Sequence, residues 1–232
     1  MASPKILVVE DDRSIADVLK YNLAGSGYEV ICSYDGQDAI NQARLKLPDL
    51  IVLDLMIPVI DGLEVCRRLR AESATRDTPV LMLTAKSEES DQLVGFTVGA
   101  DDYVVKPFSI KIVLERIKSL LRRRKRSSES ENDSITRNGI TIDRTRHRVS
   151  VEDRSIDLTP SEFRLLDTLI RQPGRAFDRS ELIDAALGGD TLVLERTIDV
   201  HIRSLRKKLG PEATEMIQTV RGVGYRFRES RV

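Results

Sequence analysis

The chain has few of the residues that build metal centres and disulfide frameworks, with two cysteines and two histidines among 232 residues. Cys32 and Cys66 lie in apolar-rich segments and match no metal or redox spacing. This pattern predicts reduced, packed thiols in a cytoplasmic protein. His147 and His201 are far apart and have no neighbouring Cys or His, which argues against a zinc site.

Long hydrophobic runs are also missing. No apolar run approaches the ~18 residues that a membrane-spanning helix needs. The N-terminus enters its first predicted strand without the apolar segment of a signal peptide. Hydrophobic residues make up 41% of the chain and charged residues 32%, as is typical of a globular protein. We therefore expect a cytoplasmic protein that does not act at a membrane.

Charge of one sign is not in excess, because the formal net charge is zero. Residues 1–121, however, carry 14 Lys and Arg against 19 Asp and Glu, a difference of −5, while residues 196–232 carry 9 against 4, a difference of +5. Between them lies a polar, serine-rich stretch with nothing to bury. We predict an acidic domain over 1–125, a flexible linker over 126–134 and a second domain over 135–232.

The first domain alternates apolar, strand-like runs with segments of helical periodicity. Five such units in ~120 residues predict an α/β fold with a doubly wound parallel sheet. The expected strand order is 2-1-3-4-5. The third strand, 50–54, has no polar alternation, which indicates burial on both faces. A fourth helix is expected near 88–98.

Polar side chains follow four of these strands where each one ends. In chain order they are Glu10-Asp11-Asp12, Asp54, Thr84 and Lys106. Each alone has an ordinary interpretation as a turn residue or a solvated charge, but the carboxyl ends of parallel strands share one crevice. Converging carboxylates repel unless a cation neutralises them, and oxygen ligands without Cys or His favour Mg²⁺ or Mn²⁺. A hydroxyl and an ammonium nearby can then meet the oxygens of a phosphoryl group.

Residues 5–125 resemble a receiver domain of a two-component response regulator, through the motifs I-L-V-V-E-D-D, L-D-L-M-I-P, M-L-T-A and G-A-D-D-Y-V-V-K-P-F. The resemblance implies a flavodoxin-like fold, with Asp54 as the acceptor of a phosphoryl group from a sensor histidine kinase. Its implied Mg²⁺ ligands are Glu10, Asp11, Asp54 and the carbonyl of Met56. Thr84 and Lys106 would bind the phosphoryl oxygens. Asp12 is expected to point elsewhere, and Lys106-Pro107 is a candidate cis peptide.

The resemblance also implies a switch. The hydroxyl of Thr84 would be drawn toward the phosphoryl group, and Tyr103 would swing inward to fill the space. The ordinary alternative is that Tyr103 is simply an aromatic residue of an edge strand.

A homodimer face is implied as well, formed by the fourth helix, the fifth strand and the fifth helix. Asp101 and Asp102 would pair with Arg116 and Arg123 across a two-fold axis. At one further pair of positions the family often has a basic and an acidic residue, where this chain has Gln92 and Ile112. Their joint loss leaves no orphan charge but weakens the case for a standard interface.

The sequence of the second domain predicts an α+β fold. Short alternating segments at 140–143, 148–151 and 155–158 indicate antiparallel strands. Thr159-Pro160-Ser161-Glu162 and Asp178-Arg179-Ser180-Glu181 are each typical of a helix start. A third helix, 195–209, has one apolar stripe and a basic remaining surface, and a hairpin follows it. A solvated basic helix is the alternative to a nucleic-acid-binding one. The order of elements indicates a winged helix-turn-helix.

Residues 135–229 resemble the output domain of OmpR/PhoB-type regulators, through L-T-P-S-E-F-R-L-L, R-T-I-D-V-H-I-R-S-L-R-K-K-L and V-R-G-V-G-Y-R-F. The resemblance implies major-groove binding by the third helix and minor-groove binding by the wing. The implied contacts are Arg203, Ser204 and Arg206 to bases, Lys207 and Thr219 to phosphates, and Arg221 to the minor groove.

Two departures stand out in this domain. Ser204 stands where relatives often carry Arg, which implies an altered base preference at that position. Leu187 stands where the family usually has Trp. The loop 189–194 would touch RNA polymerase in relatives, although its sequence here adds no support of its own.

We expect a phosphorylation-activated, sequence-specific transcription regulator that binds tandem half-sites on double-stranded DNA as a dimer, and not an enzyme. A phosphatase or phosphotransferase is disfavoured because Met56 is not the second Asp of a D-x-D site. An architectural DNA binder that ignores phosphorylation is the other alternative. It would bind DNA equally well after Asp54→Ala.

Overall fold

The structure of the protein is a computed structural model that describes residues 3–85, 99–128, 134–152, 154–186, 196–211 and 213–229. The chain divides into two units, Met1–Arg122 and Arg123–Val232. The helix α5 (Ile110–Ser128) runs past this division and three residues into the predicted linker. Residues 129–133 of that linker lie outside the described residues, and the predicted domain boundaries stay a prediction.

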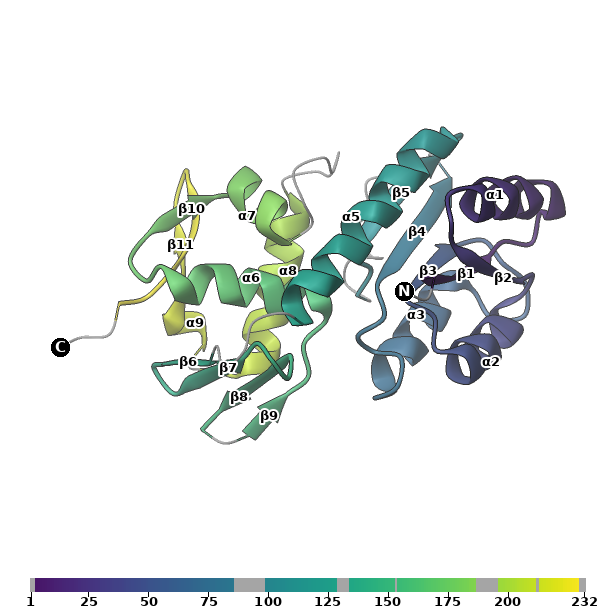
Figure 1. Cartoon of the computed structure of the whole chain (residues 1–232). Helices are drawn as coiled ribbons and strands as arrows, with labels where there is room; N and C mark the ends of the chain where they lie inside the picture. The colour runs from purple at the N-terminus through teal and green to yellow at the C-terminus, as the bar shows by residue number, and fades with distance from the viewer. Residues whose placement is uncertain are drawn as a thin grey trace. The chain divides into compact units, whose positions relative to one another are not determined.

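The first unit contains a parallel sheet in the order β2-β1-β3-β4-β5, which confirms the predicted topology (Figure 1). Its strands are β1 (Lys5–Val9), β2 (Glu29–Ser33), β3 (Leu50–Asp54), β4 (Val80–Ala85) and β5 (Asp102–Lys106). Its other helices are α1 (Arg13–Gly25), α2 (Gly36–Lys46) and α3 (Gly62–Ala71). The predicted helix at 88–98, with Gln92, lies outside the described residues.

The strand β3 is buried along its whole length, as its uninterrupted apolar run predicts. Leu50 and Val52 pack with apolar residues of α1 and α5 in one core cluster. The helices α2 and α3 contact each other and lie on the opposite side of the sheet (Figure 1). Because β3 sits between β1 and β4, Asp54 at its end lies in the middle of the carboxyl edge.

Asp12 begins α1 and does not face the other acids. Its Oδ1 accepts hydrogen bonds from the backbone amides of Ser14 at 2.8 Å and Ile15 at 3.3 Å. A carboxylate there satisfies amides that have no partner within the helix. This geometry agrees with the expectation that the third acid of the run points elsewhere.

The described residues of the second unit form a four-stranded antiparallel sheet, the helices α6 to α9 and a three-stranded sheet in the order β10-β12-β11, a winged helix-turn-helix arrangement. Its elements are β6 (Ser134–Arg137), β7 (Ile140–Asp143), β8 (Arg148–Val151), β9 (Arg154–Ile156), α6 (Pro160–Arg171), β10 (Ala176–Asp178), α7 (Arg179–Ala186), α8 (Arg196–Leu209), α9 (Ala213–Met216), β11 (Ile217–Val220) and β12 (Gly224–Phe227). The elements β6, β10 and α9, of three or four residues each, were not predicted from the sequence.

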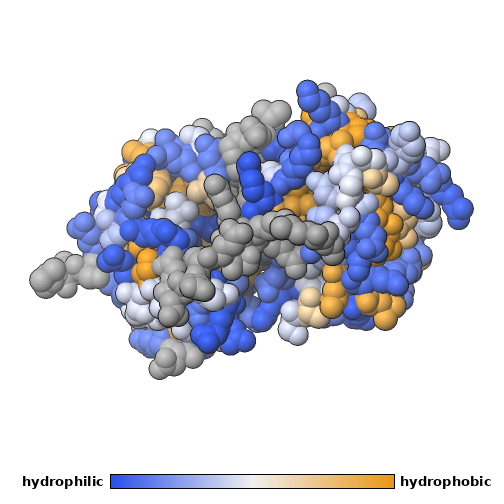
Figure 2. Space-filling view, in the orientation of Figure 1, coloured by the Kyte–Doolittle hydropathy of each residue, from blue (hydrophilic) through white to orange (hydrophobic). Residues whose placement is uncertain are grey.

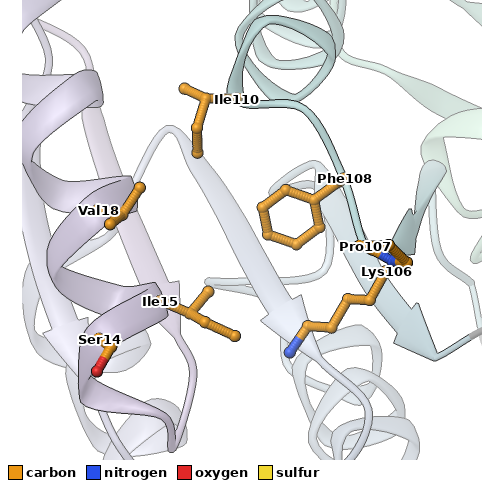
Figure 3. A pocket seen from close by; sticks show the side chains of 7 residues that line it. All are labelled: Ser14, Ile15, Val18, Lys106, Pro107, Phe108 and Ile110. Carbon is orange, nitrogen blue, oxygen red and sulfur yellow. The ribbon is translucent and has the colours of Figure 1, made fainter.

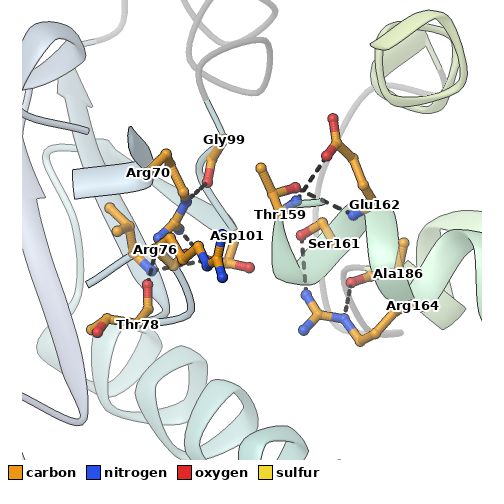
Figure 4. Close-up of polar contacts among 11 residues, drawn as sticks. Arg70, Arg76, Thr78, Gly99, Asp101, Thr159, Ser161, Glu162, Arg164 and Ala186 are labelled. Carbon is orange, nitrogen blue, oxygen red and sulfur yellow. Dashed lines mark hydrogen bonds and ion pairs between the residues drawn. The ribbon is translucent and has the colours of Figure 1, made fainter. Parts of the chain in front are cut away.

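Both predicted helix starts in this unit are confirmed. The Thr159 hydroxyl accepts a hydrogen bond from the Glu162 amide at 3.3 Å, and a Glu162 oxygen accepts one from the Thr159 amide at 2.8 Å (Figure 4). Asp178 and Glu181 exchange the same two bonds at the start of α7, at 2.7 and 3.0 Å. Each reciprocal pair satisfies two helix-terminal amides and so settles where its helix begins.

The surface is mostly hydrophilic on the face that Figure 2 shows, with smaller apolar patches. Exposed large apolar residues include Val18 and Tyr21 of α1 and Met56 and Val59 of the loop after β3. Within the described residues, no helix has both the length and the apolar character to cross a membrane.

Substitution of Gly62 tests the close approach of α3 to the end of β3, where Asp54 lies. A Cβ at this position would lie 2.2 Å from the backbone oxygen of Asp54 and 2.8 Å from the Cα of Leu55. We expect Gly62→Ala to lower the free energy of unfolding in urea by about 1–3 kcal/mol, because backbone must move to admit the methyl group. Gly25→Ala is the matched control, since a Cβ there meets nothing within 4 Å. Equal effects of the two substitutions would contradict the tight junction.

Candidate functional site

Three acidic side chains converge at the carboxyl edge of the parallel sheet. Glu10 and Asp11 follow β1 and Asp54 ends β3, and one carboxylate oxygen of each lies within 4.8 Å of the others. Glu10 and Asp54 are 1% and 4% exposed, whereas Asp11 faces solvent. The fold therefore brings together the acids that the strand ends predicted.

Lys106, at the end of β5, reaches into this acidic group. Its Nζ donates to Asp54 Oδ2 and to Glu10 Oε2, at 2.7 Å each. Three carboxylates then face one ammonium, so the local charge is still negative. Oxygen donors with excess negative charge and an open side fit a hard divalent cation such as Mg²⁺.

The pKa values in the pocket follow from burial and from these bonds. Burial raises the pKa of Glu10 to about 7, and the charge of Asp54 adds to this while Lys106 opposes it. Burial lowers the pKa of Lys106, but its hydrogen bonds to Asp54 and Glu10 outweigh that effect and the pKa is raised overall. The lysine is thus held in its cationic form beside the acids.

Two other predicted residues lie close to Asp54. The backbone amide of Met56 donates to Asp54 Oδ1 at 3.2 Å, which places the main chain of the following loop at the pocket. Thr84 is 2% exposed in β4, the strand next to β3. The roles of the Met56 carbonyl as a ligand and of Thr84 as a phosphoryl contact stay predictions.

Tyr103 is largely buried in this structure. It lies in the edge strand β5 and is 8% exposed, and burial raises the pKa of its hydroxyl well above the usual value. The coupling of Tyr103 to Thr84 stays a prediction.

The acids of the predicted dimer face have partners within their own chain. Asp101 Oδ2 accepts from Arg70 Nη2 at 2.8 Å, and Arg70 also donates to the backbone oxygens of Gly99, Arg76 and Thr78 (Figure 4). Asp102 Oδ2 accepts from Arg116 Nη1 at 3.4 Å. Both aspartates are fully buried.

Pairing of Asp101 and Asp102 across a two-fold axis would therefore have to share or exchange these bonds, and it stays a prediction. Arg70 was not predicted to be a partner of Asp101, because a basic residue near the end of a helix usually carries a solvated charge. The side chain of Arg123 lies outside the described part of the chain. Ile112 is 50% exposed on α5.

A cavity of about 590 Å³ lies beside Lys106, between α1 and the segment that follows β5 (Figure 3). Its lining residues are Ser14, Ile15, Val18, Lys106, Pro107, Phe108 and Ile110. The peptide bond between Lys106 and Pro107 is cis, as expected. One wall of this mainly apolar cavity is thus the stem of the lysine that enters the acidic pocket.

The helix α8 of the second unit has the predicted buried stripe of Ile198, Ile202, Leu205 and Leu209. Arg203 and Lys207, one turn apart, are exposed on another side of the helix. Thr219 in β11 and Arg221 in the turn before β12 are exposed as well. These four side chains lie where a basic surface for nucleic acid was expected.

Ser204 and Arg206 have hydrogen-bond partners within their own unit in this structure, and their contacts with bases stay predictions. The Ser204 hydroxyl donates to Glu162 Oε1 of α6 at 2.6 Å. Arg206 donates from Nε to the backbone oxygen of Ile217 at 3.1 Å and from Nη2 to Thr219 Oγ1 at 3.0 Å. A helical position shows only which side chains share a face, and the neighbouring elements supply the acceptors that these two half-buried side chains bind.

Tyr225 lies in the wing, which is the hairpin of β11 and β12. It was not predicted from the sequence to be a functional residue. Its hydroxyl donates to Asp199 Oδ1 of α8 at 2.8 Å, and Arg179 of α7 donates to the same oxygen at 3.0 Å. The guanidinium groups of Arg179 and Arg206 lie 5.5 and 5.6 Å from the centre of the Tyr225 ring. The available signal was the tyrosine within the V-G-Y-R-F motif, which marks the hairpin but not its contacts.

Comparisons with known proteins agree with both units. Residues 6–118 match the family described as response regulator receiver domain, and residues 153–227 match the family described as transcriptional regulatory protein, C terminal. The fold and the acidic edge thus belong to a response regulator with a receiver domain and a DNA-binding domain.

Relatives extend this over nearly the whole chain. It is 46% identical over 223 residues to the phosphate regulon transcriptional regulatory protein PhoB of Rhizobium meliloti (strain 1021), covering 96% of this chain and 97% of that protein. It is 42% identical over 225 residues to the response regulator ArlR of Staphylococcus aureus (strain Mu50 / ATCC 700699), covering 97% and 99%.

Two solved structures cover 98% of this chain and all of theirs. A RitR mutant has a TM-score of 0.80 at 27% identity. DrrB of Thermotoga maritima, described as an OmpR/PhoB homolog, has a TM-score of 0.51 at 31% identity. The chain belongs to the OmpR/PhoB-type response regulators, a family of two-component transcription regulators.

Arg70 offers a test of the buried ion pair in the receiver domain. We expect Arg70→Met to lower the free energy of unfolding by about 3–5 kcal/mol, because it removes the guanidinium that pairs with the buried carboxylate of Asp101. Arg68→Met on the same helix is the control, since its pair with Glu64 is solvent-exposed and contributes about 0–1 kcal/mol. Urea unfolding followed by circular dichroism compares them, and similar losses would argue against the importance of the buried pair.

Proposed function

We propose that Asp54 is the phosphoacceptor of this response regulator, with a sensor histidine kinase as the donor. The observation that carries the proposal is the convergence of Asp54, Glu10 and Lys106, joined by two hydrogen bonds of 2.7 Å. An Asp54 oxygen would attack the phosphorus in line, and the lysine ammonium would offset charge on the phosphoryl oxygens. Thr84 would donate its hydroxyl to one of them.

The acidic pocket would hold Mg²⁺ through Glu10, Asp11, Asp54 and the carbonyl of Met56. The supporting observation is an all-oxygen donor set, with one oxygen of each acid within 4.8 Å of the others. Bound there, the ion supplies positive charge against the oxygens of the transferred group. The protein contributes position and electrostatics in this proposal, and we assign it no enzymatic activity toward other molecules.

Phosphorylation would add roughly −1.5 to −2 charges at Asp54. We propose that this change, passed through Thr84 and Tyr103, favours a homodimer that binds tandem half-sites on double-stranded DNA in the cytoplasm. The face would include Asp102 and Arg116, with Asp101 and Arg123 as further members. A contact with RNA polymerase through the loop 189–194, which lies outside the described residues together with Leu187, rests on the family alone.

In the output domain α8 would enter the major groove and the wing the minor groove. Arg203 is assigned to a base edge, Lys207 and Thr219 to phosphates and Arg221 to the minor groove. The exposure of these four side chains supports the assignment. The contacts of Ser204 and Arg206 with bases stay predictions, because both side chains are bonded within the domain in this structure.

Asp54→Asn tests the phosphoacceptor. Incubated with acetyl phosphate and Mg²⁺, the wild-type chain should gain one phosphoryl group by intact mass, and the variant none, because an amide oxygen is a poor nucleophile. Asp12→Asn is the control, since Asn still begins α1 well and Asp12 is outside the pocket. Phosphoryl uptake by the Asp54 variant would refute the assignment.

A DNase footprint with and without acetyl phosphate tests the link to DNA. Protection of tandem half-sites should strengthen with the phosphodonor in the wild-type chain and stay weak in Asp54→Asn. Binding that ignores both the donor and Asp54 would favour the architectural DNA binder over a phosphorylation switch.

Arg203 and Lys207 should behave differently in DNA binding. Arg203→Ala should weaken binding by about 10- to 100-fold and relax preference at one base pair, as expected for a lost base contact of 1–3 kcal/mol. Lys207→Ala should weaken all duplexes alike and reduce the slope of log affinity against log salt by about 1. Lys20→Ala, an exposed change in the receiver domain, is the control. Unchanged affinity in both α8 variants would refute this surface.

A further inference from the structure

The carboxylate of Glu162 is a meeting point between the first helix of the output domain and its recognition helix, α8. It accepts from the Ser204 hydroxyl at 2.6 Å, from Lys208 Nζ at 2.6 Å and from the Thr159 amide at 2.8 Å. The side chain of Glu162 is 4% exposed. Three donors thus satisfy one nearly buried acid, as a carboxylate away from water requires.

The spacing of Ser204 and Lys208 along α8 determines which movements of the helix these bonds restrain. Ser204 and Lys208 are four residues apart, so they lie on one face and one turn apart. Glu162 binds one with each carboxylate oxygen, Oε1 to Ser204 and Oε2 to Lys208. Because Glu162 also closes the capping box of α6, its own position is restrained. The two bonds therefore resist both rotation and sliding of α8 relative to α6.

The opposite flank of α8 is held by the wing. Arg206 donates to the backbone oxygen of Ile217 and to Thr219, and Asp199 accepts from Tyr225. Between the two flanks the exposed side chains of α8 include Arg203 and Lys207. A helix fixed on both sides can present this strip in one orientation only.

We propose that Ser204 and Glu162 are positioning residues that set the orientation of the recognition helix, and that Ser204 does not read a base. The proposal rests on the proposed binding of DNA by α8. It predicts that position 204 contributes to affinity for every duplex and to preference for none. Base selection along this part of the helix then falls to Arg203.

The test uses the full-length chain with acetyl phosphate and Mg²⁺, and a duplex that the wild-type chain selects from a random pool. Affinities are measured for that duplex and for its single-base variants, at a temperature where circular dichroism shows every protein folded. Ser204→Ala and Glu162→Gln should each bind about 3- to 30-fold more weakly to all duplexes with an unchanged order of base preference, as for a lost hydrogen bond to a charged group.

Two further variants separate positioning from general stability. Ser204→Thr keeps a hydroxyl and should bind DNA within about twofold of wild type. If Ser204 only stabilised the fold, Ser204→Ala would bind DNA as wild type wherever it is folded. The double variant Ser204→Ala with Glu162→Gln should bind no more weakly than the weaker single variant, because both remove one interaction. Ser155→Ala, an exposed serine of β9, is the matched control and should bind as wild type.

Loss of preference at a single base pair in Ser204→Ala, or effects that multiply in the double variant, would overturn the proposal. If Glu162→Gln does not fold, the comparison of Ser204→Ala with Ser204→Thr decides the proposal, because both leave the capping box intact.

If the wild-type chain selects no duplex, the proposed DNA binding fails, and the inference is then decided without DNA. Shifts in melting temperature that are not additive between Ser204→Ala and Glu162→Gln support the restraint of α8 by the Ser204–Glu162 bond, and additive shifts overturn it.

Discussion

Mutual repulsion among carboxylates at one edge of a parallel sheet is the constraint on which the receiver domain depends. Glu10 and Asp54 are nearly buried, so neither can rely on water to screen its charge. The ammonium of Lys106 bonds to both and partly neutralises them. The remaining negative charge leaves the edge suited to a cation and, with it, to an incoming phosphoryl group.

In the output domain, too, acidic side chains each bind donors from more than one element. Glu162 begins α6 and binds α8, while Asp199 of α8 binds both Tyr225 and Arg179. These two acidic side chains thus hold helices and wing together, while Arg203 and Lys207 of α8 are exposed. Stabilising contacts and exposed basic side chains lie on different sides of the same helix.

Much of the architecture follows from local sequence. The uninterrupted apolar run of β3, the alternation of strand and helix, and the two capping boxes predicted elements that the structure confirms. They are readable because each signal lies within a few residues of the chain. The short elements β6, β10 and α9 carry no such signal, since β10 exists through pairing with β12, about 50 residues further on.

The sequence by itself determined which residue types meet at the sheet edge, because strand order and strand ends place Glu10, Asp54 and Lys106 there. Only the tertiary structure decided the partners of long polar side chains. Arg70 donates to Asp101, Ser204 donates to Glu162, and Arg206 donates to the backbone of Ile217. These side chains have several rotatable bonds, so their contacts depend on acceptors brought close by distant segments, and helical spacing alone cannot identify them.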